Sequence, residues 1–172
     1  MSLFFLGDTH EQQRVIDICK ANTNEGDVVL SVGDNAFGFG PSLELPKNLL
    51  TIAGNHDNPS VIANSPNFLG RWGKATIYTG GIHYNVLYIS GAGSTDKDQR
   101  ISGIDWWRKE ELGYTESNEL LEFVENRAGM IDIVLSHDCP KFVTGYYSHT
   151  TKLLQEVHNI LENRNRRYYH IF

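Results

Sequence analysis

The sequence has little cysteine, no long apolar run and no excess of basic residues, and each absence narrows the functions open to it. Its two cysteines, Cys19 and Cys139, lie too far apart for a Cys-x-x-Cys metal pair. We therefore expect free thiols in a reducing compartment, with the cytoplasm as the location. The apolar run at residues 3–6 is too short for a signal or membrane segment, and no basic stretch precedes it.

The charge balance is acidic, with 15 Lys and Arg against 21 Asp and Glu and a formal net charge of −6. This balance argues against binding extended nucleic acid through a broad basic surface. It leaves room for a small phosphorylated substrate, because a bound metal can reverse the sign of the field inside a site. The length of 172 residues suits a single domain over residues 1–172.

Strand-like and helical patterns alternate in the first third of the sequence. Apolar runs at residues 3–6, 28–32 and 49–53 are typical of buried strands, and residues 11–21 carry apolar side chains at helical spacing. A strand, a helix and a second strand in this order predict parallel strands with a right-handed crossover. We therefore expect the three strand ends at one sheet edge, where open α/β sheets bind ligands.

The rest of the sequence predicts a second set of elements. Residues 75–78 and 83–90 alternate around a glycine-containing turn and indicate an antiparallel hairpin. Helical spacing recurs at residues 116–126 and 150–162, and β-like runs recur at residues 130–135 and 167–172. The fold class expected from these patterns is α/β.

Four short polar motifs follow the strand-like runs. They read Gly-Asp-Thr-His at residues 7–10, Gly-Asp-Asn at 33–35, Gly-Asn-His-Asp at 54–57 and Ser-His-Asp at 136–138. Each motif alone is more typical of a hydrogen-bonded loop. Carboxylate, imidazole and amide groups gathered from several strand ends together predict a site for divalent metals.

Individual positions in these motifs suit particular tasks. On an extended segment, Asp8 and His10 would point the same way and could chelate one ion. Asp34 has two oxygens and could bridge two cations, although alone it would more often be a turn residue or helix cap. In the third motif, Asp57 could hydrogen-bond the far ring nitrogen of His56 and fix its tautomer.

A second candidate pair lies in the loop after the hairpin. Asp96 and Arg100 are four residues apart, so a turn would let them pair and leave the guanidinium facing a substrate phosphate. The alternative is an ordinary surface ion pair.

The order of these motifs resembles that of the calcineurin-like metallophosphoesterases over nearly the whole chain. The runs at residues 93–100, 106–111 and 136–140 further resemble the compact single-domain members found in bacteria and their phages. The resemblance implies a four-layer α/β/β/α sandwich with a two-metal site at one sheet edge. It also implies hydrolysis of a phosphomonoester or phosphodiester, as in a phosphatase or phosphodiesterase. The acidic net charge favours a small phosphorylated substrate over a long polyanion.

The resemblance assigns ligands to two divalent ions. Asp8 and His10 would hold the first ion, Asp34 would bridge, and Asn55 and His137 would hold the second. Mn²⁺ or Fe suits this mixed oxygen and nitrogen set best, with Zn²⁺ and Ni²⁺ as alternatives.

The resemblance also assigns the chemistry. A metal-bound hydroxide would attack phosphorus, because the cations lower the pKa of water. His56 would act as general acid or stabilise charge on the leaving oxygen, with Asp57 behind it.

The sequence departs from the family in one place, because no Gly-His-x-His motif occurs in it. In the family, this motif adds a histidine to each metal. We therefore expect weaker metal binding and reduced activity, whether the chain is a truncated product or a natural short variant. The alternative is a noncatalytic protein-interaction module on the same fold, which would need no metal and would expose an apolar patch.

Overall fold

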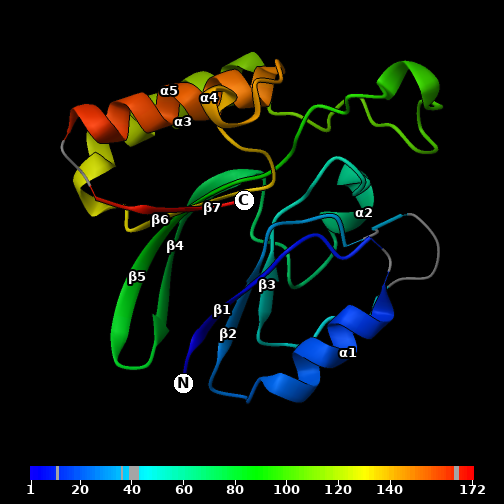
Figure 1. The fold of residues 1–172 in the computed structure, drawn as a ribbon, viewed down its shortest axis with the longest axis vertical. Coiled ribbons are helices and arrows are strands. Elements are labelled where there is room, and N and C mark those ends of the chain that lie inside the picture. Colours follow the sequence, from blue (N-terminus) through cyan, green and yellow to red (C-terminus); the bar gives the residue numbers. More distant parts are fainter. Residues whose placement is uncertain (11, 36, 39–42, 165–166) are drawn as a thin grey trace.

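A computed structural model describes residues 1–10, 12–35, 37–38, 43–164 and 167–172. Over these residues the chain is a mixed α/β protein with two β-sheets and five α-helices (Figure 1). The α/β class expected from the sequence is therefore confirmed. None of the helices in the described ranges combines the length and the apolar character that crossing a membrane requires.

The first sheet contains three parallel strands, β1 (Leu3–Leu6), β2 (Val28–Ser31) and β3 (Leu49–Thr51), in that spatial order. Helix α1 (Gln13–Asn22) connects β1 to β2, as the strand and helix patterns predict; Glu11, where the predicted helix began, lies outside the described residues. All three strands end at the same edge of the sheet, which places their polar motifs together.

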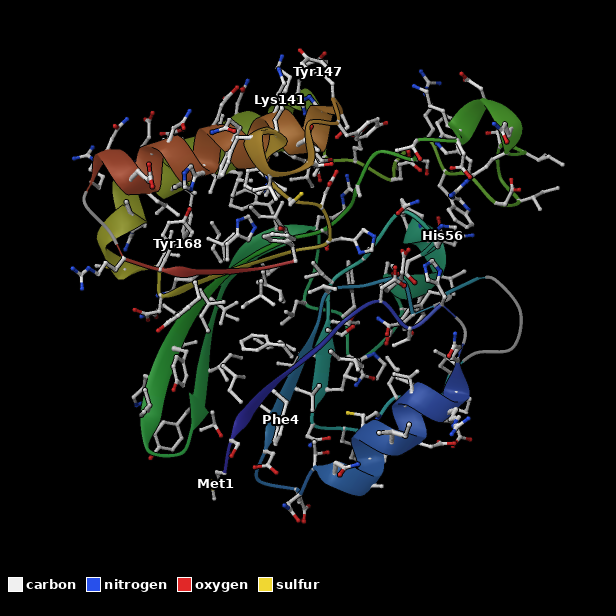
Figure 2. All side chains as sticks on the ribbon, viewed as in Figure 1. Met1, Phe4, His56, Lys141, Tyr147 and Tyr168 are labelled. Atoms are coloured by element: carbon white, nitrogen blue, oxygen red, sulfur yellow. The ribbon has the colours of Figure 1, made fainter. Side chains whose placement is uncertain are left out.

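The expectation of a buried first strand is wrong for two of its side chains. Phe4 and Phe5 are 37% and 42% exposed, and Phe4 can be located on β1 in Figure 2. The cause is the position of β1 as an outer strand of the sheet, bordered by β2 on one side. An apolar run alone does not distinguish an outer strand from a central one.

The second sheet has the order β4-β5-β6-β7, formed by β4 (Trp72–Thr79), β5 (Ile82–Ile89), β6 (Ile133–Ser136) and β7 (Tyr169–Ile171). Strands β4 and β5 make the predicted antiparallel hairpin, and β6 and β7 continue the sheet in parallel with β5. The hairpin turns at Gly80 and Gly81, whose φ angles of 59° and 80° suit glycine and a tight two-residue turn.

Two long helices, α3 (Tyr114–Arg127) and α5 (His149–Asn163), lie against this second sheet (Figure 1). The sequence did not predict the short helices α2 (Pro59–Ile62) and α4 (Lys141–Thr144). Helix α2 has a clear local cause, because Asn58 accepts a hydrogen bond from the Ser60 backbone N–H and Pro59 opens the helix. Two 3₁₀ turns, η1 (Lys97–Gln99) and η2 (Ala128–Met130), complete the elements, and η2 delays the start of β6.

Three hydrophobic clusters hold these elements together. One joins α3 and α5 to the second sheet, the next contains residues of both sheets, and the third packs α1 on the first sheet. Their fully buried members include Leu120 and Leu154 in the first cluster, Leu30, Ile52, Val86 and Leu135 in the second, and Ile16 and Leu49 in the third. Because the second cluster pairs the sheets face to face, the loop after β6 reaches the edge where β1 to β3 end.

Candidate metal centre

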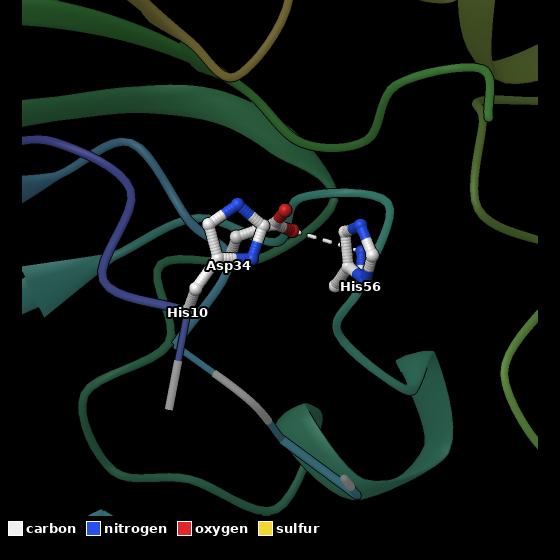
Figure 3. Close-up of side chains that lie close together, drawn as sticks. All are labelled: His10, Asp34 and His56. Carbon is white, nitrogen blue, oxygen red and sulfur yellow. Dashed lines mark hydrogen bonds between the residues drawn. The ribbon is translucent and has the colours of Figure 1, made fainter. Parts of the chain in front are cut away.

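The loops after β1, β2, β3 and β6 bring their polar side chains to one place. Two sets of three candidate ligand atoms lie within 4.8 Å of one another, one from His10, Asp34 and His56, the other from Asp8, Asp34 and His137. Figure 3 shows His10 and His56 on either side of Asp34. Asp34 belongs to both sets, which is the arrangement that a bridging ligand requires.

Asp34 is buried, with 1% of its surface exposed, yet only one of its oxygens is hydrogen-bonded within the described chain. Its Oδ1 accepts a 2.8 Å bond from the His56 backbone N–H, whereas Oδ2 accepts none and lies 3.5 Å from His137 Nε2. Burial and the neighbouring Asp34 carboxylate raise the pKa of Asp8. Crowded carboxylates with an unpartnered buried oxygen are costly, and a bound cation would relieve both problems.

The backbone is strained at the same point. Among the described non-glycine residues, only His10 and Asp34 have a positive φ, at 38° and 52°. The prediction that Asp8 and His10 share an extended segment is therefore wrong at His10, whose N–H donates to the Asp34 carbonyl at 3.1 Å. Their side chains still meet, with 2.9 Å between His10 Nε2 and Asp8 Oδ2. Strain of this kind persists where the surrounding structure holds it, commonly at functional sites.

Gly54 permits the close contact between the loops after β2 and β3. A Cβ atom on Gly54 would lie 2.0 Å from Asp34 Oδ1 and 2.8 Å from His137 Cε1. A side chain at this position would therefore push apart two of the candidate ligands.

The second candidate ligand pair is oriented by bonds behind it. His137 Nδ1 lies 2.9 Å from the Val32 carbonyl, which can only accept, so Nδ1 carries the proton of the neutral ring. Nε2 then presents its lone pair towards Asn55 Oδ1, at 3.2 Å, and towards Asp34. Three lone pairs facing one another suit a cation, which explains why these residue types fit a metal.

Sequence reasoning missed the residues that orient Asn55. Its Nδ2 donates to Ser94 Oγ at 3.2 Å, and Ser94 in turn donates to the buried Glu110 carboxylate at 2.7 Å. This arrangement turns Asn55 Oδ1 towards the centre. Ser94 and Glu110 fall within the runs at residues 93–100 and 106–111. The sequence therefore contained these residues in a notable pattern, but the pattern did not indicate what they contact.

The predicted hydrogen bond between the His56 ring and the Asp57 carboxylate is not formed. Asp57 instead accepts three backbone N–H bonds, from Asp34 at 2.8 Å, Gly54 at 2.9 Å and Phe37 at 3.1 Å. Burial raises its pKa to about 6. Asp57 therefore ties the loops after β2 and β3 together through three backbone donors.

His56 contacts Arg100 in place of Asp57. Arg100 Nη2 lies 3.0 Å from His56 Nε2, and a guanidinium only donates, so Nε2 accepts in this contact. Arg100 also pairs with Asp96 across 2.8 Å, as the spacing predicts, and its side chain is only 10% exposed. Burial lowers the pKa of His56, and the positive charge of Arg100 acts in the same direction.

Together the four loops present two overlapping sets of metal-ligating atoms, and Arg100 contacts His56 of one set. A scan against models of known protein families finds no match for this chain, and a search of curated proteins also finds none.

Proposed function

We propose that this protein is a metal-dependent phosphoesterase with the four-layer α/β/β/α sandwich of the metallophosphoesterases. The order of α1, the first sheet, the second sheet and the α3 and α5 pair supports this architecture (Figure 1). The observation that carries the function is Asp34, which offers oxygens to both ligand sets and keeps a buried Oδ2 without a hydrogen bond in the described chain.

Two divalent ions would divide these ligands as the family resemblance assigns them, whereas the two sets grouped by distance place Asp8 with His137 and His10 with His56. Asp8, His10 and Asp34 would hold one ion, and Asp34, Asn55 and His137 would hold the other. Mn²⁺ or Fe suits the mixed donor set, with Zn²⁺ and Ni²⁺ as alternatives. Such ions would supply an acidified water molecule and neutralise charge on the phosphate. The nitrogen of His56 also lies within reach of His10 and Asp34, so this histidine is a further candidate ligand.

Arg100 and His56 would act on the substrate itself. Arg100 is held by Asp96 and directs its guanidinium into the centre, where it can bind phosphate oxygens. Its contact keeps His56 Nε2 as an acceptor in the free protein. A phosphate that engages Arg100 would release Nε2, which could then hold a proton for the leaving oxygen.

The test is calorimetric titration of Mn²⁺ into metal-stripped protein, followed by hydrolysis of p-nitrophenyl phosphate and bis(p-nitrophenyl) phosphate. We expect two binding sites and hydrolysis of at least one ester that requires Mn²⁺. Protein without Mn²⁺ binding, or hydrolysis that is indifferent to chelator, would overturn the proposal.

One observation favours the noncatalytic alternative. Exposed apolar side chains gather around a cavity of about 570 Å³ beside α4 and β7, and they include Phe142, Val143 and Phe172. Such a patch suits a protein partner. The two functions differ in thermal stability, because Mn²⁺ at a hundred times its Kd should add about 2.7 kcal/mol to a metalloenzyme and nothing to a scaffold.

A further inference from the structure

We propose that a groove beside the metal centre binds a second phosphate group, so that the substrates are phosphorylated ends of short oligonucleotides. This inference rests on the proposed function and specifies the substrate class of the same centre. We call the site the Arg108 groove, and it is a cavity of about 780 Å³ between α2 and the start of α3. Its lining includes Pro59, Ser60, Arg108, Lys109, Tyr114 and His149.

Two observations relate the Arg108 groove to the metal centre. Pro59 and Ser60 open helix α2 directly after the 54–57 motif, and Figure 2 shows His56 beside this helix. A second cavity of about 260 Å³ is lined by Arg108 and by Ser94, the residue that orients Asn55. Arg108 therefore lines both cavities. The second cavity is also lined by Ser94, which holds the candidate metal ligand Asn55.

The acidic groups of the groove are engaged by other residues. Glu116 makes two bonds of 3.0 Å with Arg71, and Glu111 Oε1 accepts bonds of 2.7 and 2.8 Å from Thr150. Arg108, by contrast, makes no hydrogen bond or ion pair with any described residue. An unpaired guanidinium in a concave site is suited to binding a phosphate through two parallel bonds.

The charge of the groove differs in sign from that of the protein. Three cationic side chains, Arg71, Arg108 and Lys109, line it together with two carboxylates, whereas the protein carries a net charge of −6. A local excess of positive charge on an acidic protein focuses anions at that place. The excess is too small for a long polyanion, and this favours a short one.

An aromatic ring lies beside the cations. Tyr114 is 81% exposed, and its ring stands edge-on to His149 with 5.0 Å between centroids. His149 is itself held by a 2.9 Å bond between its Nε2 and Ser117 Oγ. A supported and exposed ring in the same groove as Arg108 offers a stacking surface for a nucleoside. The metal centre, Arg108 and Tyr114 together suit a ligand in which a nucleoside carries two phosphate groups.

The test compares hydrolysis of the internucleotide phosphodiester bond in the dinucleotides pTpT and TpT, which differ by one 5′-phosphate, in the presence of Mn²⁺. One charge-assisted phosphate contact should raise kcat/KM for pTpT about tenfold over TpT. The Arg108→Gln variant should reduce this ratio to about one. The matched control is Arg127→Gln at the exposed end of α3, outside the groove, which should keep the ratio of the wild type. A ratio near one in the wild type, or an unchanged ratio in Arg108→Gln, would overturn the proposal.

A binding measurement separates failure of the groove from failure of the function. Thymidine 3′,5′-bisphosphate should bind the Mn²⁺-loaded wild type about tenfold more tightly than thymidine 5′-monophosphate, and Arg108→Gln should remove the difference. Arg108-dependent binding without hydrolysis of any ester would refute the phosphoesterase and retain the groove. Hydrolysis with equal affinities for the two nucleotides would refute the groove alone.

Discussion

The carboxyl edge of the first sheet and the helical layer on the second sheet differ in whether their buried polar groups have hydrogen-bond partners. At the sheet edge, Asp34 keeps an oxygen without a hydrogen bond and adopts a positive φ. In the helical layer, Ser148 and Thr151 exchange bonds of 3.0 and 2.9 Å at the start of α5. Arg71 likewise satisfies both Glu116 oxygens.

This difference indicates that the two regions are built for different tasks. Reciprocal hydrogen bonds stabilise the helical layer, because each buried donor and acceptor finds a partner. Unpartnered oxygens and strained residues at the sheet edge reduce stability, and they are retained where binding or catalysis requires them. Substitutions should therefore affect stability and metal binding separately in the two regions.

The largest effect on stability should come from the core of the helical layer. Leu154 of α5 is fully buried, and Leu154→Ala should lower the free energy of unfolding by about 2–5 kcal/mol. Urea unfolding monitored by circular dichroism measures this loss. The folded variant should bind Mn²⁺ as the wild type does, and a large change in Mn²⁺ affinity would show that the two regions are not independent.

At the sheet edge, Asp34→Asn should have the opposite pattern. Because substitution of residues that merely support a ligand costs 10–100-fold, loss of a ligand shared by two ions should reduce Mn²⁺ affinity and turnover at least about 100-fold. Metal-free protein should become more stable, by about 1 kcal/mol, because a neutral amide replaces a buried carboxylate and asparagine tolerates positive φ. Calorimetry measures the Mn²⁺ affinity, and urea unfolding measures the stability. Unchanged turnover would exclude Asp34 as the bridging ligand.

The parts of the fold and of the candidate site that the sequence predicts are those with regular periodicity. The run at residues 3–6 and the motif that follows it needed only a parallel β-α-β arrangement to place Asp8 and Asp34 at one edge, and β1 and β2 are parallel. Strand β5 and both long helices followed from patterns that persist over eight or more residues, whereas only residues 75–78 of β4 were predicted. Long periodic segments are the most predictable part of any sequence.

Side-chain partners in the loops could not be predicted in this way. The alternation rule applies to extended backbone, whereas His10 and Asp34 have left-handed conformations. Asp57 turns towards three backbone N–H groups rather than towards His56, because loops distant in the sequence bring those donors to it. The support of Asn55 by Ser94 likewise joins residues 39 positions apart. Such contacts depend on tertiary packing, which spacing does not specify.

A histidine outside the candidate ligand sets should show how buried groups in the second sheet respond to pH. His170 of β7 donates to Ser136 Oγ across 2.7 Å, since the Ser136 hydroxyl donates to the Asp138 carbonyl. Burial lowers the pKa of His170 from 6.5 to about 4. The unfolded chain therefore takes up this proton first as the pH falls, and between pH 6.5 and 4 the free energy of unfolding should decrease by about 3 kcal/mol.

The measurement is urea unfolding of metal-free protein at several pH values. His170→Gln should remove this part of the pH dependence, because glutamine can still donate to Ser136 but does not titrate. His83→Gln, at an exposed position on β5, is the matched control and should keep the slope of the wild type. Identical slopes for the wild type and His170→Gln would show that His170 does not titrate in this range.

The smallest effect should come from the cap of α5, where it tests the comparison with Asp34 most directly. Ser148 accepts a bond from the Thr151 N–H, and its own N–H donates to Thr151 Oγ1. Ser148→Ala should lower the free energy of unfolding by about 1 kcal/mol, since it removes one side of this reciprocal cap. Asp34→Asn should change the same quantity in the opposite direction, although each substitution alters one buried polar side chain. If Ser148→Ala leaves stability unchanged, or if Asp34→Asn lowers it, the two regions do not differ in the way that their hydrogen bonds indicate.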